Sequence, residues 1–102
     1  MIMVTGTARF AAGEIERLRD AFAANIAATR AEDGCDHYAY AVDVGDPDLL
    51  HISERWRDED AIEAHMKAPH MATFMGVLGA ARIEALSVRM YRADYLKTLL
   101  GE

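Results

Sequence analysis

The segment from Glu54 to Phe74 carries most of the side chains that could do chemistry in this 102-residue chain. It holds the only tryptophan, Trp56, and two of the four histidines, His65 and His70. Because histidine titrates near neutral pH, His65, which falls on the apolar stripe of a predicted helix, is a candidate proton acceptor. The same spacing also fits a buried histidine bonded to a backbone carbonyl, and spacing alone does not separate the two roles.

A carboxylate on an otherwise apolar strand face is the second candidate. Glu54 alternates with Ile52 and Trp56 along a predicted strand, and a buried carboxylate requires a partner. Arg89, from the last predicted strand, or a neighbouring histidine would supply one. If the partner is His65, the pair would fix the tautomer of that imidazole and raise its basicity.

The two histidines do not predict a metal site. Five residues of helix turn through about 500°, which points His65 and His70 roughly 140° apart, and Pro69 interrupts the helix between them. The chain has no pair of cysteines, and spacing indicates no close carboxylate partner for these histidines, so we expect no bound metal. It also lacks a G-x-G-x-x-G or Walker sequence, so we expect no nucleotide cofactor.

Aromatic and thioether side chains provide candidates for a binding surface. Tyr38, Tyr40 and Phe74 suit stacking on a flat aromatic ligand, and they suit ordinary core packing equally well. Met71 and the methionines near it would add a soft, adaptable wall. These residues favour a hydrophobic ligand without identifying one.

Composition excludes several classes of protein. A net charge of −6 and a pI near 5.1 argue against a nucleic-acid surface. No apolar stretch approaches the ~20 residues that span a bilayer, and the first residues do not resemble a signal peptide. A single cysteine precludes an internal disulfide and suits the cytoplasm. We expect one cytoplasmic domain, residues 1–102, with neither nucleic-acid nor membrane partners.

Hydrophobic periodicity predicts the element order β-α-β-β-α-β. Alternating patterns indicate strands over residues 1–10, 37–44, 49–57 and 82–92, with a turn over 45–48 before the third. A helix is predicted over residues 14–31, with Gly34 as the left-handed cap that stops it. A second helical region would begin at the Asp58 cap and restart at Pro69. This order is a ferredoxin-like α+β fold with a four-stranded antiparallel sheet. The tail, residues 93–102, is too apolar to extend into water and is predicted to contact a partner subunit.

The run ERWRDEDAIEAHMKAPHMATF, from Glu54 to Phe74, resembles the signature segment of the antibiotic biosynthesis monooxygenase (ABM) family. The element order and the apolar tail extend this resemblance over nearly the whole chain. It implies a homodimer, the dimeric α/β barrel, in which two sheets pack face to face and each subunit keeps a pocket between its helices and its sheet. Some members oxidise phenols or quinols with molecular oxygen and no cofactor, and others degrade haem.

The haem-degrading branch has an asparagine, a tryptophan and a histidine where this chain has Thr5 or Gly6, His65 and Met75. The resemblance therefore implies a cofactor-independent monooxygenase acting on a small aromatic or quinone-like substrate. His65 would be the base and Arg89 an anion stabiliser.

A ring slot would be formed by Trp56, Tyr38, Phe74 and Met71, with Tyr40 and His70 beside it. Two alternatives stay open: a non-catalytic dimeric binding module for a hydrophobic ligand, and an isomerase on the same fold.

Overall fold

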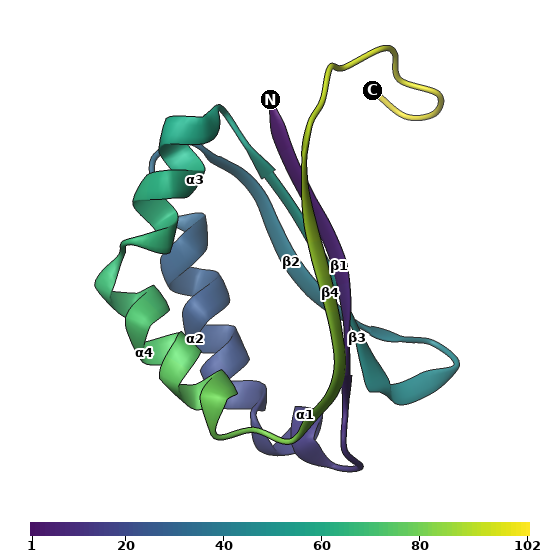
Figure 1. Ribbon diagram of the computed structural model, residues 1–102. Coiled ribbons are helices and arrows are strands. Elements are labelled where there is room, and N and C mark those ends of the chain that lie inside the picture. The colour runs from purple at the N-terminus through teal and green to yellow at the C-terminus, as the bar shows by residue number, and fades with distance from the viewer.

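The computed structural model describes residues 1–102 as a sheet with helices on one face (Figure 1). The elements are β1 (Ile2–Phe10), α1 (Glu14–Arg17), α2 (Arg19–Arg30), β2 (Cys35–Asp43), β3 (Asp46–Trp56), α3 (Glu59–Met66), α4 (Pro69–Gly79) and β4 (Ile83–Arg92). The four strands lie in the order β2-β3-β1-β4, and every neighbouring pair is antiparallel. The predicted ferredoxin-like α+β fold is confirmed. No helix combines the length and hydrophobicity that crossing a membrane requires.

Several element boundaries differ from the sequence-based expectation, and β2 begins at Cys35, two residues before its predicted start. The first helix is divided at Leu18, whose φ of −95° and ψ of 3° bend the chain so that Ile15 and Phe22 both reach the core. β3 begins at Asp46, within the predicted turn, because Asp46 pairs with Asp43 of β2. An ion pair of 2.7 Å also joins Asp46 to Arg9. A register shift between Val42 and Asp43 of β2 leaves Pro47 without a strand partner, so its missing N–H does not interrupt the ladder.

The core lies between the helices and one face of the sheet. Alternation along β1 and β3 places every second side chain on this face, as the sequence predicts. The buried apolar residues are Ile2, Val4, Ala8, Phe10, Ile15, Leu18, Phe22, Tyr38, Leu50, Trp56, Ala61, Ile62, Met71 and Phe74. This packing fixes the distance between the sheet and α3, which contains His65.

Three local signals set the direction of α3 and α4. The Asp58 side chain accepts a hydrogen bond of 2.9 Å from the Ala61 N–H and caps α3. Gly34 has a φ of 83°, and a Cβ added there would lie 2.6 Å from the Cβ of Ala61, so only glycine fits where the chain passes α3. Pro69 begins α4 at a position where its missing N–H has no partner to lose.

The helices cover one face of the sheet but do not extend over β4 at its edge (Figure 1). The side chains of β4 on this face are Leu86, Val88 and Met90, which pair with Ala8, Gly6 and Val4 and are exposed. Met66 of α3 is also exposed, because it lies beside this uncovered part of the sheet. An apolar surface therefore remains open between α3 and β4.

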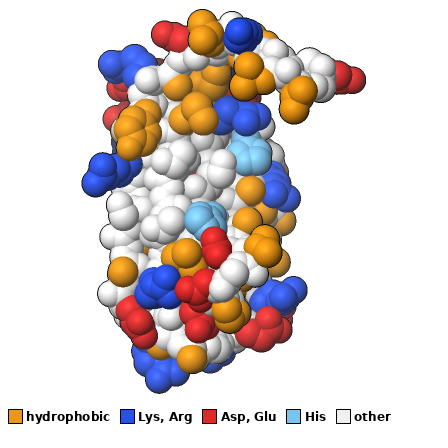
Figure 2. All heavy atoms as spheres, turned by 90° about the vertical axis from the view of Figure 1, so that its right-hand side faces the viewer, with side chains coloured by type: hydrophobic (Ala, Val, Ile, Leu, Met, Phe, Trp, Pro, Cys, Tyr) orange, Lys and Arg blue, Asp and Glu red, His pale blue; other side chains and the backbone are white.

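The opposite face of the sheet carries no helix. Figure 2 shows backbone and side chains that are neither apolar nor charged (white) across its centre, with apolar side chains gathered where the C-terminal tail leaves. A hollow of about 460 Å³ on this face is lined by Thr5, Gly6, Thr7, His51, Ile52, Ser53, Ser87 and Arg89. In the tail beyond β4, Leu96, Leu99 and Leu100 are almost fully exposed.

Candidate functional site

An apolar cavity of about 380 Å³ lies between β1, β4 and α3, on the same face of the sheet as the helices but where no helix covers β4. Its apolar lining consists of Val4, Ile62, Met66, Val88 and Met90, and its charged lining of Glu54, Glu63, Lys67 and Arg89. Glu54 is the one buried side chain among the charged four. A cavity of this size and lining suits a small hydrophobic molecule with few polar groups.

Glu54 presents one carboxylate oxygen to this cavity. Its Oε1 accepts a hydrogen bond of 2.8 Å from the indole N–H of Trp56. Its Oε2 has no hydrogen-bond partner. Thr29 Oγ1 is the only side-chain N or O atom that is both fully buried and without a hydrogen bond. Oε2 of Glu54 is therefore not fully buried, and it borders open space. Burial raises the pKa of Glu54, and the hydrogen bond from Trp56 opposes that rise. A carboxyl group in such surroundings is suited to exchanging a proton with a bound ligand.

Trp56 lies behind Glu54 rather than in the cavity. Its side chain is fully buried, and its ring packs against His65 with 4.6 Å between the ring centroids. It also meets Tyr38 edge to face. Trp56 therefore holds Glu54 in place from within the core, and it does not form a wall of the predicted ring slot.

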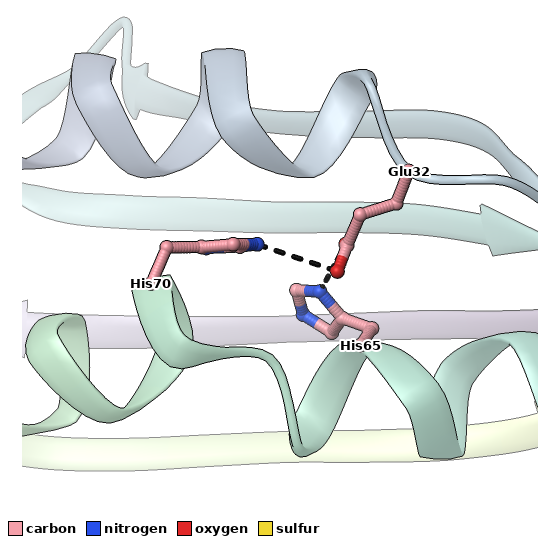
Figure 3. A group of neighbouring side chains, drawn as sticks. All are labelled: Glu32, His65 and His70. Carbon is pink, nitrogen blue, oxygen red and sulfur yellow. Dashed lines mark hydrogen bonds and ion pairs between the residues drawn. The ribbon is translucent and has the colours of Figure 1, made fainter.

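His65 pairs with a carboxylate that the sequence did not indicate. Its Nδ1 lies 2.6 Å from Oε2 of Glu32, a residue in the turn after α2. His70 reaches the same carboxylate, with 3.3 Å between its Nε2 and Glu32 Oε1. Figure 3 shows the three side chains converging from α3, α4 and the end of α2. Burial lowers the pKa of His65, and Glu32 opposes this effect.

The expected separation of the two histidines is wrong. The predicted separation of roughly 140° applies to two residues on one continuous helix. Ala68 is instead extended, with φ of −65° and ψ of 142°, and it redirects the chain before α4. His65 and His70 thereby meet at one carboxylate, which comes from 33 residues before His65. The reason for excluding a metal from these residues no longer holds.

A chain of hydrogen bonds continues from His70 into the core. Nδ1 of His70 lies 2.9 Å from Asn25 Oδ1, and the Asn25 amide nitrogen donates to the Tyr38 hydroxyl over 3.2 Å. The hydroxyl groups of Tyr38 and Tyr40 are 2.5 Å apart. Burial raises the pKa of both phenols. These two tyrosines use their hydroxyls inside the protein, and Tyr38 has no face open to a ligand.

The other residues proposed for the ring slot also belong to the core. Met71 and Phe74 are buried, and Phe74 packs edge to face with Phe22. Tyr40 and Phe74 border a gap of about 40 Å³, which is too small for an aromatic ring. The structure does not bring Trp56, Tyr38, Phe74 and Met71 around one cavity.

Arg89 is not the partner of Glu54. It pairs with Thr5 on β1, whereas Glu54 pairs with Val4, so strand alternation turns their side chains to opposite faces. Arg89 borders the hollow on the open face as well as the rim of the apolar cavity. No hydrogen bond or ion pair connects the two residues.

Two residues of this region were missed in the sequence. Glu32 follows the C-terminus of α2, where the helix dipole disfavours a carboxylate, and that unfavourable position was an available signal. Asn25 is buried among the apolar residues of α2, three positions after Phe22. A polar side chain at a core position of a helix indicates a specific hydrogen-bond partner.

The sequence model for antibiotic biosynthesis monooxygenases matches residues 1–77. The chain belongs to the antibiotic biosynthesis monooxygenase (ABM) family. No functionally curated protein matches this ABM protein. The family match covers β1 through most of α4 and therefore includes both Glu54 and the Glu32–His65–His70 group.

Solved structures support the same assignment. A candidate antibiotic biosynthesis monooxygenase from Deinococcus radiodurans is 27% identical with a TM-score of 0.89, covering 99% of this chain and 100% of its own. PA3566 from Pseudomonas aeruginosa is 30% identical with a TM-score of 0.79, covering 91% and 94%. Rv0793 from Mycobacterium tuberculosis, at 24% identity and a TM-score of 0.83, covers 95% and 98% and supports the fold alone.

Proposed function

We propose that this ABM protein is a monooxygenase that oxidises a small phenol or quinol with molecular oxygen, with Glu54 as the proton acceptor. The observation that carries the proposal is the free Oε2 of Glu54 on the wall of the apolar cavity. A carboxyl group with a raised pKa can take a phenolic proton and hold it away from water. Glu54 takes over the role that the sequence suggested for His65, because His65 is only 2% exposed and lines none of the larger cavities.

The proposed reaction needs no external reductant. Removal of a proton makes a quinol electron-rich enough to pass electrons to oxygen. One oxygen atom replaces a ring hydrogen, the other leaves as water, and the quinol, which supplies all four electrons, becomes a hydroxyquinone. The apolar walls would keep water from the peroxide stage. Lys67, which lines the same cavity, would supply the positive charge that favours the phenolate.

Oxygen uptake tests this function. We expect the protein, stripped of metal and flavin, to consume oxygen with at least one member of a panel of reduced quinones and polycyclic phenols. The rate should exceed autoxidation in buffer and scale with protein concentration. Uptake at the autoxidation rate with every compound would refute the monooxygenase. Thermal stabilisation without uptake would indicate the binding module, and solvent proton exchange without uptake would indicate the isomerase.

We also propose that the working unit is a homodimer in the cytoplasm. Leu96, Leu99 and Leu100 are exposed in the single chain, and a partner subunit would cover them. We expect light scattering to give twice the chain mass for the full-length protein. The double substitution Leu99→Asp and Leu100→Asp should shift it toward the monomer, whereas Lys97→Asp in the same tail should not. A monomeric full-length protein would contradict this proposal.

A further inference from the structure

We propose that Glu32, His65 and His70 bind one divalent transition-metal ion, of the class of Zn²⁺, Co²⁺ or Ni²⁺. The three side chains come from three separate elements and converge on one point (Figure 3). Each offers a ligand atom, and these atoms all lie within 4.8 Å of one another. Ligands about 2.0–2.1 Å from a tetrahedral ion lie about 3.3 Å from each other, so small side-chain movements suffice.

The contact between His70 and Glu32 is incomplete without a cation. Nδ1 of His70 faces Asn25 Oδ1, which only accepts hydrogen bonds, because the Asn25 nitrogen donates to Tyr38. Nδ1 therefore carries the hydrogen, and Nε2 of the neutral ring has a lone pair. That lone pair faces Glu32 Oε1 at 3.3 Å, so two acceptors point at each other. A metal ion between them would turn an unfavourable contact into two coordinate bonds.

Asn25 acts here as the outer-shell partner that metal-binding histidines usually have. Histidine ligands commonly donate their second ring N–H to an oxygen acceptor, which fixes the tautomer and the ring orientation. Asn25 is itself buried and held by Tyr38, so it cannot easily turn away. His70 is thus oriented to present Nε2 to the position of the ion.

The site is partly open to solvent through two of its three side chains. The His65 side chain is 2% exposed, whereas those of Glu32 and His70 are 20% and 26% exposed. An ion would reach it between the end of α2 and the start of α4, and water would complete its coordination. Two imidazole nitrogens with one carboxylate suit Zn²⁺, Co²⁺ and Ni²⁺, whereas Mg²⁺ and Ca²⁺ prefer oxygen ligands alone.

Trp56 provides a built-in reporter of binding. It is the only tryptophan, and its ring lies 4.6 Å from that of His65 between centroids. In untagged full-length protein treated with a chelator, we expect Co²⁺ or Ni²⁺ to quench its fluorescence with a stoichiometry of one ion per chain. Zn²⁺ should compete with that quenching, and calorimetry should give the same stoichiometry for Zn²⁺. Mg²⁺ at the same concentration should have no effect.

Variants assign the binding to this site. Loss of an outer-shell partner costs about 10–100-fold in metal affinity, and loss of a direct ligand should cost at least as much. We therefore expect His70→Ala and Glu32→Gln to weaken Zn²⁺ binding by about 100-fold or more, and Asn25→Ala by about tenfold. His51→Ala is the matched control, because His51 forms a separate surface pair with Asp43. It should bind as the unchanged protein does.

Absence of Zn²⁺ and Co²⁺ binding by the unchanged protein would overturn the proposal. Unchanged affinity in a folded His70→Ala variant would also overturn it. If that variant does not fold, Glu32→Gln, which preserves the size of the side chain, decides the question. The readouts need no turnover, so metal binding and the proposed oxidation can fail independently.

Discussion

Replacement of Glu54 with glutamine is expected to lower the rate of oxygen uptake by about 10²–10⁴-fold, the usual contribution of a general base. Glutamine has the same shape and still offers an oxygen to the Trp56 N–H, so the cavity should keep its form. It cannot take a proton from the phenol. The measurement is initial oxygen consumption at saturating substrate, compared with the unchanged protein.

The same substitution should make the fold more stable. Burial raises the pKa of Glu54, so the folded chain favours the neutral carboxyl group more than the unfolded chain does. As pH rises from the unfolded value through the raised pKa, ionisation of Glu54 costs the folded state stability. Glutamine avoids that cost, so its advantage should be absent at low pH and grow toward neutral pH. For a domain of this size, each kcal/mol gained raises the melting temperature by roughly 4–8 °C.

Glu63→Gln is the control for both effects. Glu63 lines the same cavity, but its side chain is exposed to solvent, whereas that of Glu54 is buried. It should change neither the uptake rate nor the pH dependence of melting. If Glu54→Gln instead retained full uptake while His65→Gln lost it, the base would be His65 and the assignment to Glu54 would be wrong.

The sequence predicted those features that depend on neighbouring residues. Asp58 and Pro69 act within one turn of their own positions, and they form the predicted cap of α3 and the predicted start of α4. Gly34 has the predicted left-handed conformation, but the cap of α2 is Ala31, three residues earlier. The alternation of β1 and β3 also determined that Glu54 and Trp56 share the buried face. Such signals need no knowledge of what lies across the core.

Partners from distant parts of the chain were not predictable in this way. His65 bonds to Glu32, which lies 33 residues earlier in the chain. Glu54 was expected to bond to a histidine or to Arg89 from another element, but its partner is Trp56 on its own strand. The helix break at Ala68 decided where His70 points, and no helical wheel extends across such a break. Aromatic type likewise did not separate a ligand slot from a core, because Tyr38 and Phe74 suit both equally well.

Removal of the Trp56 side chain should have the largest effect on stability. Trp56 is fully buried and packs against Tyr38 and His65, so Trp56→Ala is expected to cost about 3–5 kcal/mol in the free energy of unfolding. Denaturant titration followed by circular dichroism measures this loss. An average substitution lowers the free energy of unfolding by about 1 kcal/mol. A smaller loss in Trp56→Ala would mean that Trp56 does not organise the core.

Trp56→Phe separates the packing role of this residue from its hydrogen bond. Phenylalanine retains most of the buried ring but removes the N–H that stabilises the charged form of Glu54. The pKa of Glu54 should therefore rise further, and the acidic limb of the pH–rate profile for oxygen uptake should move to higher pH. Tyr40→Phe, which removes a partly buried hydroxyl that is not hydrogen-bonded to Glu54, should leave that limb in place. If the role of Trp56 were purely structural, its replacement would alter the rate equally at every pH. An acidic limb that moves in Trp56→Phe but not in Tyr40→Phe would identify Trp56 as the residue that positions Glu54 and sets its basicity.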